Sequence, residues 1–193
     1  MKPIVVFTNF WDANIIINNG FFLFTEDEKV YNFNFISNEK PNFSVFSIAL
    51  SNPPLNKLKH LQKINKLDFF CPTYNILKRY KDDKDWSKYT KDFLLLMSKR
   101  KSDLVTWIKS LVEDHMYILC CWENTAHGAN CHRKIIYDKI CESKASKNII
   151  PIYRNGDKIY KKKFIELEVV NPYPDVLVTN IQPIHGRIRL PLP

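Results

Sequence analysis

Four short runs of apolar residues, many of them β-branched or aromatic, occur along the chain between polar, Asn or Pro positions. Each run is uninterrupted rather than alternating, which is typical of strands buried on both faces of a parallel sheet. The runs are Ile4–Phe7, Val45–Leu50, Met116–Trp122 and Ile149–Tyr153. We therefore predict a sheet of buried strands with helices packed on either side.

Apolar residues recur at helical spacing in the segments between these runs, which predicts amphipathic helices. Their predicted starting points are Leu55, the capping residues Thr73, Asp85 and Ser102, and Cys131. Strands that alternate with helices predict an α/β fold. We expect a mainly parallel central sheet with helices on both faces, similar to the Rossmann and flavodoxin architectures.

Two segments do not fit this alternation, and we predict extra β elements at residues 13–35 and 154–193. The first segment contains three candidate short strands around turn signals. These are Ile15–Ile17, Phe21–Phe24 and Tyr31–Phe35. The predicted organisation is an α/β domain at residues 1–153 and a β-rich C-terminal appendage at residues 154–193 packed on it.

The net charge of +9 is concentrated in one part of the chain. Residues 54–101 hold 13 Lys or Arg against 5 Asp or Glu. A polyanionic partner such as nucleic acid explains this excess, and so does a solvated face in a Lys-rich composition. Four aromatic residues lie among these lysines, as on nucleic-acid surfaces, but their helical spacing favours core positions. They are Tyr74, Tyr80, Trp86 and Tyr89.

Cysteine content and hydropathy suggest an environment for the protein. No apolar run approaches the roughly 20 residues of a membrane span, and no signal peptide is recognisable, so we expect a cytoplasmic protein. The 5 cysteines are an odd number, which favours free thiols over a disulfide framework. Cys120 and Cys121 are neighbours on a predicted strand and face opposite sides of it. At most one of them can therefore join any given site.

The strand at Met116–Trp122, the loop after it and the helix at Cys131 bring reactive side chains together. In open α/β sheets, ligands bind beside the carboxyl ends of strands and the amino ends of helices. A cysteine at a helix N-terminus beside cationic groups has a lowered pKa. We predict four catalytic candidates: Cys121, Glu123, Cys131 and His132.

Arg133 lies in the first turn of the predicted helix, where the helix dipole disfavours a cation. Such a placement indicates an acidic partner, either Glu123 or a bound anion. In the structural alternative, Glu123 and Arg133 form a buried ion pair and the cysteines are core residues. Thr8, Asn9 and Asn52 follow other predicted strands and join Arg133 as candidate anion-binding residues.

A phosphate-bearing ligand, either a nucleotide or nucleic acid, is the partner that this crevice and the basic charge predict. The chain would then be an enzyme of unassigned reaction, and the sequence identifies no cofactor. The alternatives are a non-enzymatic basic nucleic-acid-binding module, or a thiol or metal site. The metal alternative lacks Cys-x-x-Cys spacing, and adjacent Cys131 and His132 would point about 100° apart on a helix, so we assign no metal ligand.

The central motif resembles the signature of the DUF488 family, Leu-Cys-x-Glu followed by a short loop and Cys-His-Arg. The matching residues here are Leu119, Cys121–Glu123 and Cys131–Arg133. Ser47–Ala49 and Pro72–Lys81 also resemble family segments, so the resemblance covers roughly residues 4–142. It implies a single α/β domain with a mainly parallel sheet and helices on both faces. It locates a site but implies no established activity.

Overall fold

The computed structural model describes residues 1–26, 29–34, 42–54, 56, 58–61, 64–125 and 128–154. Outside these ranges lie all but the first residue of the predicted C-terminal appendage, and also Phe35 and Leu55 of the other predicted elements. No helix among the described residues is both long and apolar enough to cross a bilayer.

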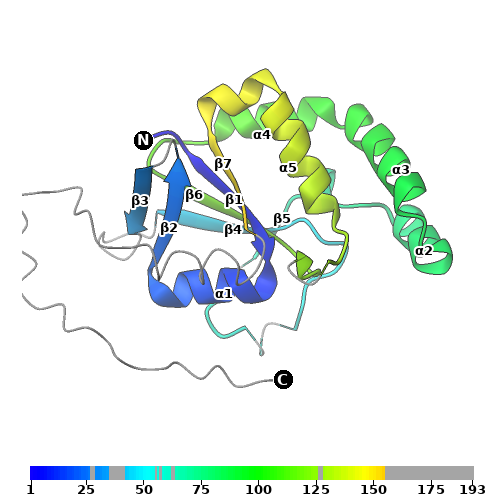
Figure 1. Ribbon diagram of the computed structural model, residues 1–193, viewed down its shortest axis with the longest axis horizontal. Helices are drawn as coiled ribbons and strands as arrows, with labels where there is room; N and C mark the ends of the chain where they lie inside the picture. The colour runs from blue at the N-terminus through cyan, green and yellow to red at the C-terminus, as the bar shows by residue number, and fades with distance from the viewer. Residues whose placement is uncertain are drawn as a thin grey trace, which may run out of the picture.

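Five parallel strands form the central sheet (Figure 1). In spatial order they are β5 (Asn65–Lys66), β4 (Phe43–Ser47), β6 (Met116–Cys121), β1 (Ile4–Asn9) and β7 (Ile150–Tyr153). Every residue of β1 and of β6 is buried, as their uninterrupted apolar runs predict. The predicted mainly parallel α/β fold is confirmed.

Helices cover both faces of the sheet (Figure 1). The helix α1 lies on one face, and α5 lies on the other with α4. The helix α3 lies beside α5, and α2 pairs with α3 (Figure 1). The bounds are α1 (Phe10–Asn19), α2 (Tyr74–Asp83), α3 (Trp86–Lys99), α4 (Lys101–Ser110) and α5 (His132–Glu142), with short 3-10 helices η2 (Asp68–Phe70) and η4 (Lys144–Asn148).

The strand order sets the neighbours of the central motif. In both the Rossmann and the flavodoxin orders the first two strands of the sheet are adjacent. Here β6 lies between β1 and β4, so the end of β6 borders two other strand ends. Asn9 at the end of β1 is paired with Cys121, and Ser47 at the end of β4 is paired with Cys120.

The prediction of a strand at Ile15–Ile17 is wrong, because these residues belong to α1. The Asn9 side chain caps this helix by accepting a hydrogen bond from the Asp12 amide, and Gly20 ends it with a left-handed φ of 72°. The isoleucines lie in the helix because Ile16 buries its side chain against the sheet. The rest of the predicted β insertion is confirmed, because β2 (Phe21–Glu26) and β3 (Lys29–Asn34) form an antiparallel hairpin.

The helix predictions have mixed outcomes. Thr73 caps α2 and Asp85 caps α3, as predicted. Ser102 caps nothing, because α4 begins one residue earlier and has no side-chain cap. Within the segment that begins at Leu55, the described residues 58–61 form a turn. Leu58 and Leu61 are nevertheless buried. Over residues 58–61 the three-residue apolar spacing therefore places two leucines in the core without forming a helix.

Candidate functional site

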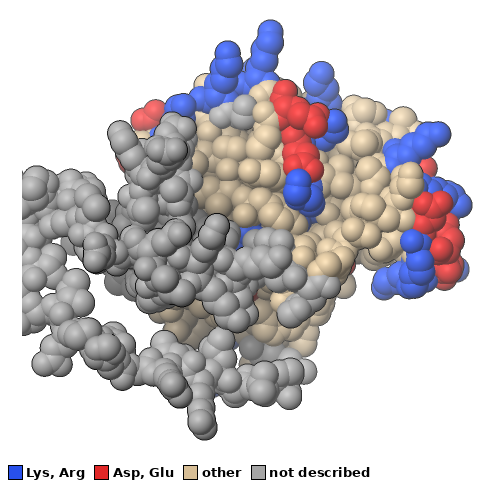
Figure 2. Space-filling view, viewed as in Figure 1, with Lys and Arg blue, Asp and Glu red and all other residues tan. Residues whose placement is uncertain are grey.

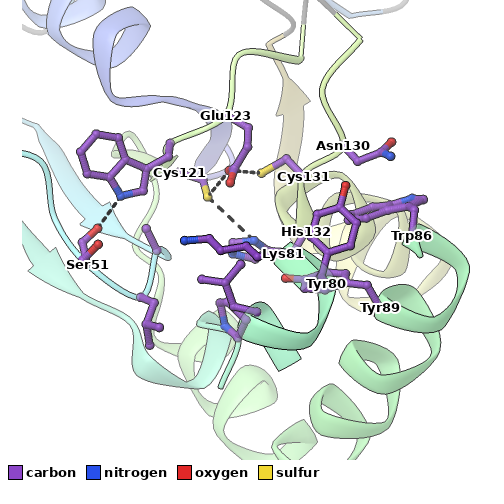
Figure 3. A pocket seen from close by; sticks show the side chains of 15 residues that line it. Ser51, Tyr80, Lys81, Trp86, Tyr89, Cys121, Glu123, Asn130, Cys131 and His132 are labelled. Carbon is purple, nitrogen blue, oxygen red and sulfur yellow. Dashed lines mark hydrogen bonds between the residues drawn. The ribbon is translucent and has the colours of Figure 1, made fainter. Parts of the chain in front are cut away.

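Four polar side chains meet where β6 ends and α5 begins. Cys121 is the last residue of β6, Glu123 follows it in the loop, Cys131 caps α5, and His132 opens that helix. Figure 3 shows the two thiols and the carboxyl group pointing toward one another, with His132 beside them. We call these residues the Cys–Glu–His cluster. All four predicted catalytic residues are therefore brought together.

The contacts within the Cys–Glu–His cluster are short. Oε2 of Glu123 accepts hydrogen bonds from both thiols, at 2.9 Å from Sγ of Cys121 and 3.2 Å from Sγ of Cys131. Sγ of Cys121 also lies 3.8 Å from Nδ1 of His132. Both cysteines and the histidine are almost fully buried. A carboxylate oxygen, two sulfurs and one imidazole nitrogen thus converge in a region with little water.

The orientation of the His132 ring is fixed from behind. Nε2 lies 2.8 Å from the carbonyl oxygen of Ile48, just past the end of β4. A carbonyl only accepts hydrogen bonds, so Nε2 carries a proton and Nδ1 is the nitrogen that faces the thiols. The Phe93 ring packs edge-on against the imidazole, with centroids 5.2 Å apart. His132 is therefore held in one ring orientation and one tautomer when neutral.

Burial and close contact shift the pKa of each group in the cluster. Burial, with the contacts to Cys131, raises the pKa of Cys121 well above its usual value. Burial would also raise the pKa of Cys131, but hydrogen bonds from Cys121 and His132 outweigh it and hold this pKa well below its usual value. Burial and the charge of Cys131 raise the pKa of Glu123. Burial opposes the imidazolium of His132, yet its contact with Cys131 raises the pKa of His132. The two cysteines are thus driven in opposite directions.

Arg133 is oriented away from this cluster and toward the loop. Its side chain is 0% exposed, and its guanidinium donates to the Glu123 carbonyl oxygen at 2.7 Å and to Oγ1 of Thr125 at 3.0 Å. The Tyr153 ring from β7 packs against the guanidinium at 5.6 Å. The guanidinium bonds the Glu123 backbone rather than its carboxylate. The ion pair of the structural alternative is therefore absent, and Arg133 supports the loop instead. In this conformation an anion in the crevice does not reach Arg133.

A pocket of about 330 Å³ opens directly above the Cys–Glu–His cluster. Its walls come from the turn after β4 and from the facing sides of α2 and α3 (Figure 3). Besides the cluster, the side chains that decide its chemistry are Tyr80, Lys81, Trp86, Tyr89 and Trp122. The stacked rings of Trp86 and Tyr89 have centroids 5.0 Å apart. The cluster is therefore the floor of an aromatic-lined pocket.

The other predicted anion-binding residues do not line this pocket. Thr8 is fully buried at the end of β1. Asn9 is also buried, and its side chain holds Asp12 through the α1 cap. Asn52 is exposed on the turn after Ser51. These residues lie at the same edge of the sheet, as predicted. However, Thr8 packs in the core, Asn9 caps a helix and Asn52 is exposed at the surface.

Residues of the basic helical segment turn out to belong to the site. From the sequence, we expect Tyr80, Trp86, Tyr89 and the lysines among them to form either a separate nucleic-acid-like surface or, for the aromatic residues, core positions. Tyr89 is buried, whereas Lys81 is exposed and reaches into the pocket (Figure 3). The resemblance of Pro72–Lys81 to a family segment is the one sequence signal that links α2 to the motif. No sequence signal identifies the Ile48 carbonyl, because a backbone group has no residue type.

Cys121, Cys131 and His132 also provide a candidate set of metal ligands. Their ligand atoms all lie within 4.8 Å of one another. The predicted angle of about 100° between the Cys131 and His132 side chains is wrong, because it requires both residues to be helical. Cys131 has an extended backbone, with φ −145° and ψ 135°, and precedes the helix.

No family model, no curated protein and no solved structure matches the chain. The resemblance to the DUF488 family therefore stays a prediction from the motif.

Proposed function

We propose that the aromatic-lined pocket binds a phosphate-bearing aromatic compound of the nucleotide class, and that the Cys–Glu–His cluster acts on it. The observation that carries this proposal is the position of the cluster at the floor of an open pocket. Buried reactive groups rarely have a structural need for such access, since core thiols and carboxyls are normally sealed. The volume of about 330 Å³ lies near the lower end of the range for small-molecule sites.

The walls of the pocket suit a planar aromatic group. Tyr80, Trp86 and Trp122 are each only partly buried, so their rings retain surface for contact. The Trp122 indole is fixed, because its Nε1–H donates to the Ser51 carbonyl oxygen at 2.7 Å. Aromatic side chains stack on nucleobases with a gain of about 1–3 kcal/mol per base. A rigid aromatic wall of this kind favours a base over a flexible aliphatic ligand.

Lys81 provides the cation that the phosphate of this ligand requires. It extends from the last turn of α2 into the pocket and forms no salt bridge with any residue that the structure describes. Two nearby cations are already paired, since Arg79 forms an ion pair with Asp92 and Lys88 with Asp83. The anion-binding role predicted for Arg133 therefore passes to Lys81 in this proposal.

The floor of the pocket supplies nucleophilic and acid–base groups. The Cys131 thiol with its lowered pKa, the His132 imidazole and the Glu123 carboxyl are the kinds of group that nucleophilic and proton-transfer reactions use. The Glu123 carboxyl contacts both sulfurs of the cluster, and the His132 imidazole contacts the sulfur of Cys121, before any ligand arrives. This preorganisation supports an enzyme rather than a passive binding protein.

The alternative of a basic nucleic-acid-binding module has weaker support. On the face in Figure 2, Lys and Arg side chains spread along the rim and around the α2–α3 end, and acidic residues lie among them there. A protein that binds a long stretch of nucleic-acid backbone usually has a continuous basic groove. The charge pattern on this face therefore fits a local phosphate contact better than a long polyanion.

Calorimetric titration of the full chain with a nucleoside monophosphate, the matching nucleoside and inorganic phosphate tests this proposal. We expect the monophosphate to bind more tightly than either part alone, because it uses both the aromatic walls and Lys81. The titrations are performed with metal-stripped and zinc-loaded protein, so that the result does not depend on a metal. Absence of monophosphate binding in both states contradicts the proposal. Tighter binding of a single-stranded oligonucleotide that does not compete with the monophosphate also contradicts it.

A further inference from the structure

We propose that the Cys–Glu–His cluster holds a zinc ion through Sγ of Cys121, Sγ of Cys131 and Nδ1 of His132. Glu123 occupies the fourth position in the resting site or gives it up to a ligand in the pocket. Sites with three protein ligands and one exchangeable position are typical of catalytic zinc. This inference goes beyond the proposed nucleotide site and does not rest on it, because it concerns the floor of the pocket without any organic ligand.

The spacing of the ligand atoms fits tetrahedral zinc. Bond lengths of about 2.3 Å to sulfur and about 2.0–2.1 Å to nitrogen give a sulfur–nitrogen edge of about 3.6 Å in a tetrahedron. Sγ of Cys121 lies 3.8 Å from Nδ1 of His132, close to this edge. The two sulfurs lie no more than 4.8 Å apart, and an ideal tetrahedron requires a sulfur–sulfur distance of about 3.8 Å, which is within this bound. The three atoms need no backbone rearrangement to reach a common ion.

The carboxyl group is placed to adapt to the ion. Oε2 of Glu123 is 2.9 Å and 3.2 Å from the two sulfurs, which is closer than ligands of one zinc ion approach each other. A bound ion therefore requires this oxygen to withdraw by several tenths of an ångström. The Glu123 side chain borders the pocket, which gives it room to move. It can then complete the tetrahedron or make way for a ligand atom.

His132 carries the outer-shell contact that zinc-binding histidines usually have. Its second ring nitrogen, Nε2, donates to the Ile48 carbonyl oxygen at 2.8 Å, which directs Nδ1 toward the sulfurs. Such contacts fix the tautomer and the ring orientation of metal-ligating histidines. The contact comes from Ile48, just past the end of β4, a different strand from the one that carries Cys121. The ligand set is thus held by β6, by the residue after β4 and by the start of α5.

The ligand chemistry selects the class of ion. Two thiolates and one imidazole in a tetrahedral arrangement favour zinc over magnesium or calcium, which prefer oxygen ligands. Two thiolates also neutralise the charge of one divalent cation, so the ion adds no net buried charge. Cys120, the neighbour of Cys121 on β6, belongs to the opposite face of the strand and is fully buried, so it does not compete for the ion.

The test is a titration of the chelator-stripped, reduced full chain with Co²⁺, followed by displacement with Zn²⁺. We expect about one Co²⁺ per chain, a thiolate-to-cobalt charge-transfer band and the visible bands of tetrahedral cobalt. Zinc should displace the cobalt and remove these bands. No organic ligand is present, so failure here leaves the nucleotide proposal untouched, and failure of the nucleotide titration leaves this result untouched.

Cys131→Ser is the most informative variant, because it removes a thiolate and keeps the fold. Cys131 is the N-cap of α5 and makes no side-chain capping bond, whereas serine is a preferred N-cap residue. We expect the variant to bind metal more than about 100-fold more weakly, since even changes in the outer shell cost about 10- to 100-fold. Cys121→Ser should give the same loss.

Cys120→Ala and Cys141→Ser are the matched controls. Cys120 lies next to Cys121 in the sequence, and Cys141 is an exposed thiol at the far end of α5. Both variants should keep the wild-type cobalt spectrum and affinity. The inference is overturned if the folded wild-type chain gives no thiolate-to-cobalt band, or if folded Cys131→Ser retains the wild-type affinity.

Discussion

Cys131 and His132 are consecutive in the sequence, yet both side chains face Cys121 at the same end of the sheet. They do so because the chain changes conformation between them. Cys131 is extended and His132 is the first helical residue, so the usual angular step between neighbours on a helix does not apply. This change of backbone conformation lets one short motif supply two groups to one site.

Cys131→Ser should be more stable than the wild type when no metal is bound. The serine hydroxyl should cap α5, which stabilises the metal-free chain by about 1 kcal/mol. That corresponds to a rise in Tm of about 2–4 °C for a chain of this size. The measurement is thermal unfolding followed by circular dichroism in the presence of chelator. Added zinc should raise the Tm of the wild type and leave that of the variant unchanged, and a variant with a much lower Tm under chelator argues against the cap geometry.

Arg133→Met should destabilise the protein rather than affect ligand binding directly. The change removes the guanidinium donor of the Glu123 carbonyl and one of the donors of the Thr125 hydroxyl, and we expect a loss of about 2–4 kcal/mol in the free energy of unfolding. Urea denaturation measures this loss. Lys134→Met is the control, because Lys134 is exposed on the same helix and forms only surface contacts, an ion pair with Asp138 and ring contacts with Tyr137 and Tyr153, among the interactions that the structure describes. A stable Arg133→Met protein that has lost phosphate binding is the result that restores the anion site predicted from sequence.

Asn9→Ala tests whether this residue serves the helix or the ligand. Asn9 accepts from the Asp12 amide at 2.8 Å and donates to the Asp12 carboxylate at 3.1 Å. Loss of an N-cap of this kind costs about 1 kcal/mol. We expect lower stability by denaturant titration with unchanged affinity for the nucleoside monophosphate. Weaker nucleotide binding at unchanged stability is the opposite outcome and assigns Asn9 to the pocket.

Lys81→Gln should weaken monophosphate binding by about tenfold, since a hydrogen bond to a charged group contributes about 1.5–3 kcal/mol. Nucleoside binding and Tm should change little, because Lys81 is exposed and forms no described salt bridge. Lys78→Gln is the matched control on the same helix, because Lys78 does not line the pocket. Equal effects of both substitutions point to a diffuse electrostatic attraction instead of a defined phosphate contact.

Thiol modification at neutral pH should separate two cysteines outside the site. Cys141 is exposed and should react with iodoacetamide first. Burial raises the pKa of Cys71 to about 11, so its reactive thiolate is scarce at neutral pH and becomes abundant only as the pH approaches that value. Peptide mapping by mass spectrometry measures both rates. Early labelling of Cys71 at neutral pH contradicts its buried position.

The strand β6, the helix α5 and the four catalytic candidates are predictable from sequence because they lie in one continuous stretch. An apolar run, a polar loop and a helical stripe define each boundary locally. The orientation of Arg133 is not predictable in this way. It depends on Thr125 in the loop and on Tyr153 from β7, and neither residue carries a signal of its partner.

The errors in the predicted fold share a physical cause. Ile15–Ile17 has the β-branched composition of a strand, but the Asn9 cap and the burial of Ile16 override that preference. Ser102 is a good capping residue by type, yet α4 begins before it. Arg100, which precedes that helix, uses its guanidinium to bind the carbonyls of Asp68 and Cys71. In each case a tertiary contact decides between two locally acceptable structures.

The four tryptophan side chains provide the most direct test of the proposed pocket. Trp86 and Trp122 line the pocket. Trp107 belongs to α4, no residue of which lines the pocket, and is buried against Phe70. In ¹⁵N-labelled protein each indole N–H gives its own NMR signal. Addition of a nucleoside monophosphate should shift the Trp86 and Trp122 signals in a saturable manner and leave the Trp107 signal in place. Shifts confined to other tryptophans, or no shift at all, would contradict the pocket as the binding site.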